Sequence, residues 1–319
     1  MKRMIRTALA AVALLLAGTA AHAQTKLSVG DVAPISATWP TFVAVDKGMF
    51  KAHGLDVTLT YAGSAAAAVQ QLVGGAFDIG LSTFDSALRA AGAGAPVTVL
   101  GVTAVKYPYS LLVAPEINSV ADLKGKTVIL SFQKDIATVL WNRYLREQGV
   151  DPASVDQVYD GATPNRYAAL SSKRVQGAFL GSPFDFRAQA DGFRRLLDFG
   201  AYAKDIPFTV PVTRRDWLAA NPDTARRFLL SLSDAVIWLY DPANRDEAAD
   251  ILSRNTKQPK DATLMTWDVY VNQLRMFSPG LGLPPAAKDL VGSMLAELGD
   301  IKSVSAIPAA AVDTSFLPH

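Results

Sequence analysis

Five hydroxyl side chains stand where the sequence predicts the first turn of a helix, a position that can bind an anion. They are Ser64, Ser82, Thr83, Ser131 and Thr163. The first N–H groups of a helix lack partners inside the helix and carry about half a positive charge, so they hold anions without a cationic side chain. A serine that only caps its helix uses the same oxygen, so capping alone explains each position equally well.

Three aromatic and two charged residues complete the set of candidate ligand contacts. They are Trp39, Phe132, Phe184, Arg166 and Asp185. The three aromatic rings would form a flat apolar slot. Arg166 follows the helix-starting Pro164, where it could donate two hydrogen bonds to a carboxylate or sulfonate. An exposed arginine is the favoured alternative, because a cation is unfavourable at a helix N-terminus. Asp185 follows a predicted strand at 175–180 and begins the next helix.

The residues that catalysis or metal binding needs are scarce. There is no cysteine, and after residue 23 only His53 and His319 remain, without partners at the spacing of a catalytic triad or a metal site. Asp85 and Asp185 could pair as catalytic carboxylates, but two solvated aspartates at helix starts are the favoured interpretation. The Gly-Ala-Gly-Ala run at 92–95 lacks the rest of a nucleotide-binding motif. We therefore expect no enzyme, no metal and no cofactor.

The elements that would position these residues alternate between strands and helices. In the first part of the chain they are a helix starting at Pro40, a strand at 55–61, a helix at 65–73 and a strand at 77–81 that leads into another helix. Alternating apolar residues mark the strands, and glycines and prolines mark the helix ends. Because ligands collect at the carboxyl ends of strands in open α/β sheets, the predicted hydroxyls should face one site.

The pattern of a strand that runs into hydroxyl residues before a helix occurs again later in the chain, and this repetition predicts two lobes. A strand at 127–130 runs into Ser131 and Phe132, and extended crossings are expected at Tyr107-Pro108 and Pro207-Phe208. Helices with apolar stripes follow the second crossing and should pack on the first sheet. We expect an α/β, two-lobed fold with the ligand cleft between lobes. The predicted parts are 24–107 (first lobe, first part), 108–207 (second lobe) and 208–319 (first lobe, second part).

These residues resemble the signature of the periplasmic substrate-binding proteins of ABC importers for sulfonates, taurine, nitrate and thiamine precursors. The matching residues are Ala44, Gly48, Phe50, Gly54-Leu55-Asp56-Val57, Gly75-Ala76-Phe77-Asp78-Ile79-Gly80 and Asp122-Leu123-Lys124-Gly125-Lys126. Arg174 and Gln176 depart from the family pattern, which has glycine and aspartate there. The resemblance implies a type II periplasmic binding protein fold, a small-molecule ligand, and an inner-membrane permease with its ATPase as partners of a monomer.

The N-terminus is typical of an exported protein. Three basic residues precede an apolar run from Ala8 to Gly18, and Ala21-His22-Ala23 is a small-x-small cleavage pattern. This predicts a signal peptide at 1–23, cleaved after Ala23, and a periplasmic product. After cleavage 28 basic residues face 29 acidic ones, a net charge of −1, which does not favour nucleic acid.

Four ligand and function classes follow from these patterns. A small organic anion, a sulfonate or carboxylate, is the first expectation. The alternative is a pyrimidine-like heteroaromatic molecule stacked on Trp39 and hydrogen-bonded by Asp185. An enzyme of the thiamine-pyrimidine synthase type shares the fold but needs histidine and cysteine clusters that are missing here. The effector half of a transcription regulator would need a helix-turn-helix where the signal peptide stands.

Overall fold

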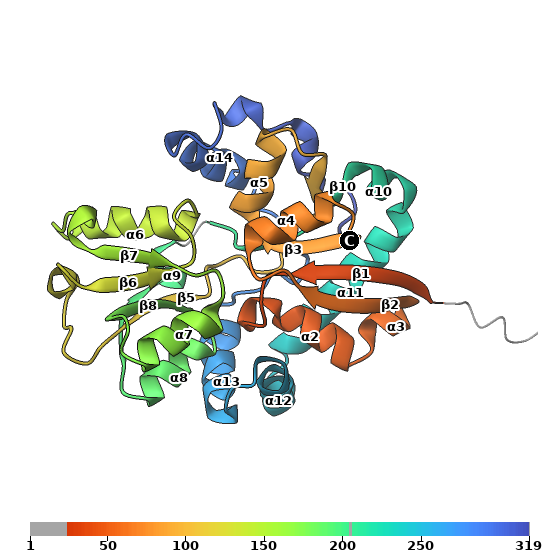
Figure 1. Cartoon of the computed structure of the whole chain (residues 1–319). Coiled ribbons are helices and arrows are strands. Elements are labelled where there is room, and N and C mark those ends of the chain that lie inside the picture. The colour runs from red at the N-terminus through yellow and green to blue at the C-terminus, as the bar shows by residue number, and fades with distance from the viewer. Residues whose placement is uncertain (1–23, 204–205, 319) are drawn as a thin grey trace, which may run out of the picture.

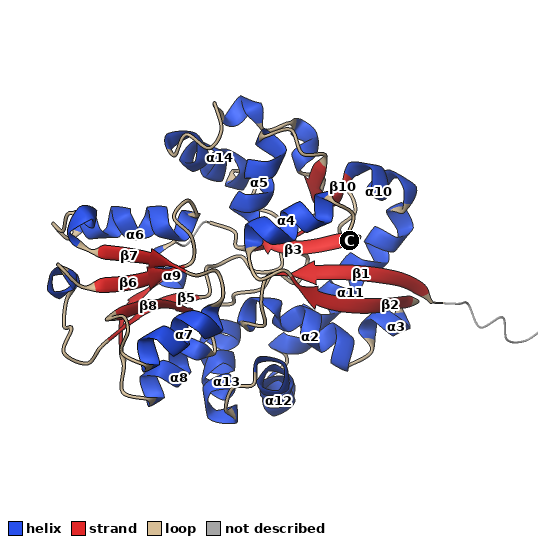
Figure 2. Ribbon diagram, viewed as in Figure 1, coloured by secondary structure: helices blue, strands red, loops and turns tan. Residues whose placement is uncertain are grey.

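The computed structural model describes residues 24–203 and 206–318 and contains two five-stranded sheets (Figure 1). The predicted signal peptide at 1–23 lies outside the described residues. Helices cover both faces of each sheet (Figure 2). In the described part of the chain, no helix is long and apolar enough to cross a membrane.

The first sheet has the strand order β2-β1-β3-β10-β4. Its strands are β1 (Thr25–Asp31), β2 (Leu55–Tyr61), β3 (Ile79–Thr83), β4 (Val97–Val99) and β10 (Thr209–Arg214). Strand β1 pairs in parallel with β2 and β3, so the carboxyl ends of these strands meet at one edge, at Asp31 and Thr83. Strand β10 runs antiparallel to β3 and β4.

The second sheet repeats this plan in the order β7-β6-β8-β5-β9. Its strands are β5 (Tyr109–Val113), β6 (Thr127–Leu130), β7 (Asp156–Tyr159), β8 (Gly177–Gly181) and β9 (Arg194–Asp198). Strand β6 is parallel to β7 and β8, and β5 is antiparallel to β8 and β9. In Figure 2 the arrowheads of β1 and β3 point toward those of β6 and β7, so the carboxyl ends from the two sheets face each other.

Helices connect the strands and cover the sheets. Their bounds are α2 (Trp39–Asp46), α3 (Met49–Ala52), α4 (Ala65–Val73), α5 (Phe84–Gly92), α6 (Ile136–Glu147), α7 (Thr163–Ser171), α8 (Phe184–Ala190), α9 (Phe199–Tyr202), α10 (Arg215–Ala220), α11 (Pro222–Tyr240), α12 (Arg245–Thr256), α13 (Lys260–Thr266) and α14 (Ala287–Glu297). Helix α11 packs its apolar stripe on α2 and α3 beside the first sheet. The predicted strand at 55–61 and helix at 65–73 are confirmed.

Two predicted helix starts differ from the structure. The strand expected at 77–81 runs from Ile79 to Thr83, so Ser82 lies inside β3 and Thr83 is the N-cap of α5. Helix α6 begins at Ile136 with Asp135 as its cap, so Ser131 lies in the loop after β6 rather than at a helix start. The carboxylate of Asp135 takes the capping role because it accepts from the Thr138 amide at 2.8 Å.

The chain passes between the sheets twice, and the two crossings lie side by side. It leaves the first sheet after β4 and returns with β10. The ring of Phe208, on the return, lies 5.0 Å from that of Tyr107 and 5.4 Å from that of Tyr109, on the outward crossing. A bridge between Ala104 and Thr209 joins the two segments. These contacts place aromatic rings next to the facing strand ends.

Candidate functional site

A cavity of about 360 Å³ lies between the carboxyl ends of the two sheets. The first sheet contributes the end of β1 with the loop after it, and the residues around the start of α5. The second sheet contributes the loop after β6 and Gly161, and the two crossings add Tyr107, Tyr109, Phe208 and Thr209. A cavity of this size fits a small organic molecule.

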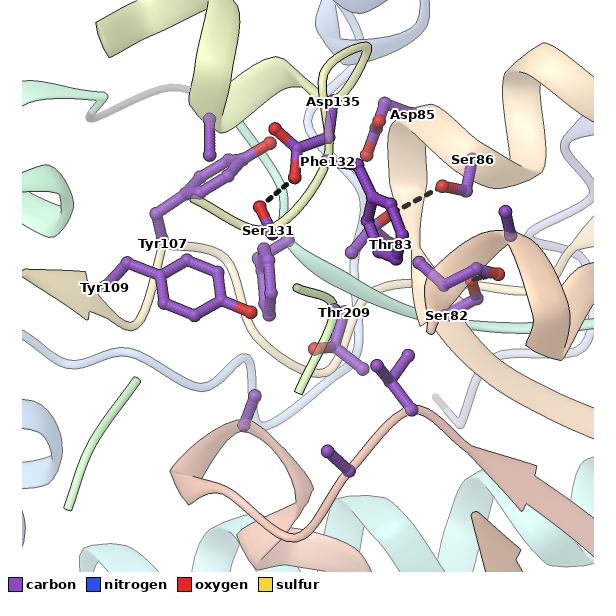
Figure 3. A pocket seen from close by; sticks show the side chains of 18 of the residues that line it. Ser82, Thr83, Asp85, Ser86, Tyr107, Tyr109, Ser131, Phe132, Asp135 and Thr209 are labelled. Atoms are coloured by element: carbon purple, nitrogen blue, oxygen red, sulfur yellow. Dashed lines mark hydrogen bonds between the residues drawn. The ribbon is translucent and has the colours of Figure 1, made fainter. Parts of the chain in front are cut away.

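Aromatic rings form much of the cavity wall. Figure 3 shows Tyr107 and Tyr109 on one side, with Phe132 reaching in from the loop after β6. A Cβ atom on Gly161 would lie 2.5 Å from Cζ of Phe132, so only glycine lets this ring pack against the backbone there. The same Cβ would lie 3.0 Å from the carbonyl oxygen of Gly63, which shows that loops from the two sheets touch at this point.

Three of the hydroxyls that line the cavity donate their protons to protein acceptors. Ser82 Oγ donates to the Ala65 carbonyl at 3.0 Å, and Thr83 Oγ1 donates to Ser86 Oγ at 2.9 Å. Ser131 donates to the carboxylate of Asp135 (Figure 3). Burial raises the pKa of Asp135, opposed by hydrogen bonds from Ser131 and Thr138 and reinforced by the charge of Asp85.

A charged network joins the two sheets at the edge of the cavity. Arg89 of α5 donates from Nε to Asp300 at 2.9 Å, from Nη1 to Asp85 at 3.4 Å, and from Nη2 to the Lys134 carbonyl at 2.5 Å. The ammonium group of Lys134 lies 3.5 Å from Asp300. Since Lys134 follows β6 and Arg89 follows β3, this network connects the two sides of the cavity.

Asp31 is the most deeply buried acid next to the cavity that has no cationic partner. It ends β1, and only 4% of it is exposed. Its Oδ1 accepts from the Val32 amide at 2.5 Å, whereas Oδ2 is buried without a hydrogen-bond partner among the described residues. The nearby Thr38 hydroxyl donates to the Ala33 carbonyl at 3.1 Å. Burial raises the pKa of Asp31 to about 7, against the lowering effect of the Val32 amide and the Thr38 hydroxyl.

Four of the ten residues predicted as ligand contacts line this cavity, and six lie elsewhere. The four are Ser82, Thr83, Ser131 and Phe132, and the six are Trp39, Ser64, Thr163, Arg166, Phe184 and Asp185. Trp39 is fully buried, and its indole Nε1 donates to the Ala248 carbonyl of α12 at 3.0 Å. Ser64 caps α4 by accepting from the Ala67 amide at 3.0 Å. The side chains of these two residues therefore support the fold around the cavity.

Arg166 is a structural residue beneath the second sheet, and the expectation that it is exposed is wrong. It is completely buried, because its guanidinium donates to the carbonyls of Phe179 and Asp160, each at 2.6 Å, and to Thr163 Oγ1 at 2.9 Å. These bonds satisfy groups that the strand and loop would otherwise leave unpaired. Thr163 is thus the acceptor of this arginine, and helix α7 is preceded by Ala162 rather than capped by Thr163.

Asp185 is also buried, which corrects the interpretation of Asp85 and Asp185 as solvated helix-start acids. Asp185 is 0% exposed and Asp85 is 3% exposed. Asp185 accepts from Ser182 Oγ and from Arg195 Nη2, each at 2.7 Å. Burial raises the pKa of Asp185, and the charge of Arg195 opposes this shift. Phe184, next to it, packs against the ring of Tyr167 with the ring centres 5.9 Å apart.

Sequence patterns missed several cavity residues. Asp31 continues the alternation of Leu27 and Val29 and ends the first strand. An acid on the buried face at the carboxyl end of a strand is the sequence signal that could have identified it as a site residue. Tyr107 and Phe208 were placed only as markers of the crossings. No group of three or more His, Cys, Asp or Glu side chains suited to a metal occurs in residues 24–203 and 206–318.

Comparison with known proteins shows which proteins are similar to this chain. The model of the NMT1-like family matches residues 20–253. YtlA of Bacillus subtilis, which is named as a binding protein, is 25% identical over 228 residues, covering 70% of this chain and 68% of YtlA.

Two of the similar solved structures each align with 92% of this chain. The alkanesulfonate-binding protein SsuA of Xanthomonas axonopodis pv. citri, bound to MOPS, matches with 99% of its own chain, 19% identity and a TM-score of 0.74. The ligand-binding component of an ABC-type import system of Staphylococcus aureus matches with 100% of its own chain, 15% identity and a TM-score of 0.70. These likenesses confirm the predicted periplasmic binding protein fold. The relatives are binding proteins, which agrees with the expectation that the chain is not an enzyme.

Proposed function

The chain belongs to the NMT1-like family, and we propose that it is the periplasmic solute-binding component of an ABC importer. The observation that carries the proposal is the cavity of about 360 Å³ between the facing carboxyl ends of two α/β sheets. In this role the protein captures a small molecule and delivers it to an inner-membrane permease, which an ATPase drives. The import component from S. aureus supports this role, because it shares the fold over its full length.

We infer that the two sheets are the centres of two lobes that close on the ligand. The lobes are 24–107 together with 208–319, and 108–207. The two crossings, which pack Tyr107 and Tyr109 against Phe208, are the positions where hinge residues absorb the change in backbone angles. The Arg89 contact with the Lys134 carbonyl lies between the lobes and would stabilise the closed form. A signal peptide at 1–23 and a monomeric, periplasmic product are part of this proposal.

The ligand has a compact organic body in this proposal. Aromatic rings of Tyr107, Tyr109 and Phe132 and small aliphatic side chains line the cavity, so an aromatic or alkyl body fits it. A sulfonate or carboxylate is the class that the sequence patterns favour, and the SsuA structure with MOPS supports it. The alternative is a heteroaromatic base.

Differential scanning fluorimetry with a ligand panel tests the proposed function. The panel contains alkyl and aromatic sulfonates, carboxylates, nitrate, organic amines and pyrimidines. A specific ligand at 100 times its Kd stabilises the folded protein by about 2.7 kcal/mol, which is a clear rise in Tm. Titration calorimetry of each hit should give one site per chain. A panel in which no compound raises the Tm would contradict a solute-binding role.

Phe132→Ala is expected to weaken binding of a hit with an aromatic or alkyl body by about 5- to 100-fold, the equivalent of about 1–3 kcal/mol. The ring lies in the cavity wall and is 36% exposed, so a ligand could cover it, and its removal should cost little stability. Titration calorimetry measures the change.

Met265→Ala is the matched control, because Met265 is an exposed apolar residue of α13 outside the cavity, 49% exposed. It should leave the affinity unchanged. Equal losses in the two variants would show that Phe132 has no particular role in the ligand contact.

A further inference from the structure

Three of the hydroxyls beside the cavity are acceptors toward a ligand. Ser82, Thr83 and Ser131 each donate their single proton to the protein, to Ala65 O, Ser86 Oγ and the Asp135 carboxylate. A hydroxyl has one proton and two lone pairs, so these three oxygens can still accept a hydrogen bond but cannot donate one in this arrangement. An anionic head group would find lone pairs at these positions.

The two cations that line the cavity, Arg89 and Lys134, each contact acceptors of the protein. Arg89 directs its Nε and both terminal nitrogens to Asp300, Asp85 and the Lys134 carbonyl. Lys134 is 70% exposed, and its ammonium group lies near Asp300. Asp300, Asp85 and the Lys134 carbonyl offset part of the charge of these two cations, so their attraction for an anion in the cavity is weakened.

Asp31 supplies the unsatisfied group. It lines the cavity at the carboxyl end of β1, and its Oδ2 is buried without a donor in the described part of the chain. Buried carboxylate oxygens are almost always hydrogen-bonded, and an exception inside a pocket indicates a missing donor. The neighbouring Thr38 hydroxyl is close enough to lower the pKa of Asp31, but it directs its proton to the Ala33 carbonyl at 3.1 Å.

We propose that the cavity binds the protonated nitrogen of a small organic cation, an ammonium or amidinium on an apolar body, with Asp31 Oδ2 as the acceptor. This inference rests on the proposed solute-binding function and names the class of its ligand. The faces of Tyr107, Tyr109 and Phe132 add to the attraction, because aromatic rings carry negative charge on their faces and hold cations within about 6 Å.

Binding of a cation to Asp31 couples to the ionisation of that carboxyl. Because the pKa of Asp31 is about 7 in the ligand-free protein, the affinity for a cation should rise about tenfold per pH unit below pH 7 and level off above it. An anion that accepted a proton from neutral Asp31 would show the opposite slope, with affinity falling above about pH 7.

Other titratable groups around the cavity are few. They are Tyr61 on β2, Asp85 and Arg89 on α5, Tyr107 and Tyr109 on the outward crossing, and Lys134 and Asp135 before α6. Strand β3 and helix α4, which pack on β1, contribute none. Burial raises the pKa values of Tyr61, Tyr107 and Tyr109, so all three stay neutral through this pH range.

The test uses two probes that share a phenylethyl body and carry opposite charges, phenylethylammonium and phenylpropionate, on the full mature chain. Calorimetry and thermal shift are run at about pH 5.5, 6.5, 7.5 and 8.5, which bracket the Asp31 pKa. The native protein should bind phenylethylammonium, with affinity rising up to about pH 7. Asp31→Asn should weaken binding of this probe at least tenfold and abolish its pH slope, since a charged hydrogen bond is lost.

Asp56→Asn is the matched control. Asp56 is an exposed residue of β2 in the same sheet, and the change removes one negative charge without touching the cavity. It should leave both affinity and slope unchanged. Urea denaturation of Asp31→Asn verifies that the variant is folded.

The remaining outcomes separate this inference from the proposed function. Preferential binding of phenylpropionate, or binding of phenylethylammonium that Asp31→Asn leaves intact, would overturn the assignment to Asp31 while the solute-binding role stands. Failure of both probes, together with an inactive sulfonate, carboxylate, amine and pyrimidine panel, would overturn both. Failure of both probes while another anionic compound binds would overturn only the cation assignment, and binding of another amine that Asp31→Asn abolishes would support it.

Discussion

The Asp31→Asn variant is expected to be more stable than the native protein at neutral pH when no ligand is bound, and the advantage should disappear toward pH 4. The pKa of Asp31 is about 7 in the folded chain, against an ordinary value of 3.8. Between these two values the unfolded chain loses the proton while the folded chain keeps it, so the contribution of Asp31 to stability falls as pH rises. The full difference is about three pKa units, or about 4 kcal/mol, and asparagine does not experience it.

Urea denaturation from about pH 4 to pH 8 measures this effect as the difference between the two unfolding free energies. The difference removes the contributions of all other titrating groups, which the two proteins share. Asp56→Asn, on exposed β2, serves as the control and should track the native protein within about 0.5 kcal/mol. If the unfolding free energies of Asp31→Asn and the native protein change in parallel with pH across the whole range, ionisation of Asp31 does not destabilise the folded protein.

The proposed role of Asp31 in binding would explain why a residue that lowers stability is kept at this position. The carboxylate of Asp31 is desolvated before any ligand arrives, and a cation would supply the missing partner for Oδ2. Functional groups are commonly kept in such unfavourable settings at the expense of stability. The stability measurement and the binding measurement therefore address the same carboxylate through independent readouts.

Local sequence patterns were sufficient for several elements around the cavity but not for the direction of their side chains. The alternation at 55–61 and the capped, apolar-striped segment at 65–73 each depend on neighbours within a few residues, and both elements are confirmed. The start of a helix near Trp39 is confirmed as well. The indole itself, however, faces α12, because its hydrogen-bond acceptor is Ala248, which lies 209 residues further along the chain. No local period contains that information.

The same limit applies to the charged residues of the site. Asp185 begins a helix, as its pattern indicates, but its partners Arg195, Ser110 and Tyr270 come from β9, β5 and the C-terminal region. Whether such an acid faces solvent, ligand or an internal partner is decided by packing between distant elements. Asp31 fits the alternation of its strand like any other strand residue. That its Oδ2 atom lacks a hydrogen-bond donor among the described residues becomes visible only when β1, β2 and the following loop are assembled.

Asp185→Ala is expected to reduce the free energy of unfolding by about 3–5 kcal/mol, because the partly buried Arg195 loses its close counter-ion and keeps only Asp198, at 3.8 Å. The carboxylate accepts from the Ser182 hydroxyl at 2.7 Å, the Phe186 amide at 2.8 Å and Arg195 at 2.7 Å. Tyr270, in the π-helical turn at Trp267–Gln273, donates to it at 3.4 Å. Asp185 thus joins the second sheet to the C-terminal helices, and its removal should loosen that contact as well.

Asp191→Ala is the matched comparison, because Asp191 ends the same helix and pairs with Arg187 at 3.2 Å on the protein surface. A surface pair contributes about 0–1 kcal/mol, so this variant should unfold near the native midpoint. Urea titrations of the three proteins at pH 7 provide the comparison. Similar small losses in both variants would mean that the Arg195 guanidinium, whose side chain is 19% exposed, is hydrated well enough to do without Asp185. A large loss confined to Asp185→Ala would establish this carboxylate as the electrostatic centre of the contact between α8 and the C-terminal helices.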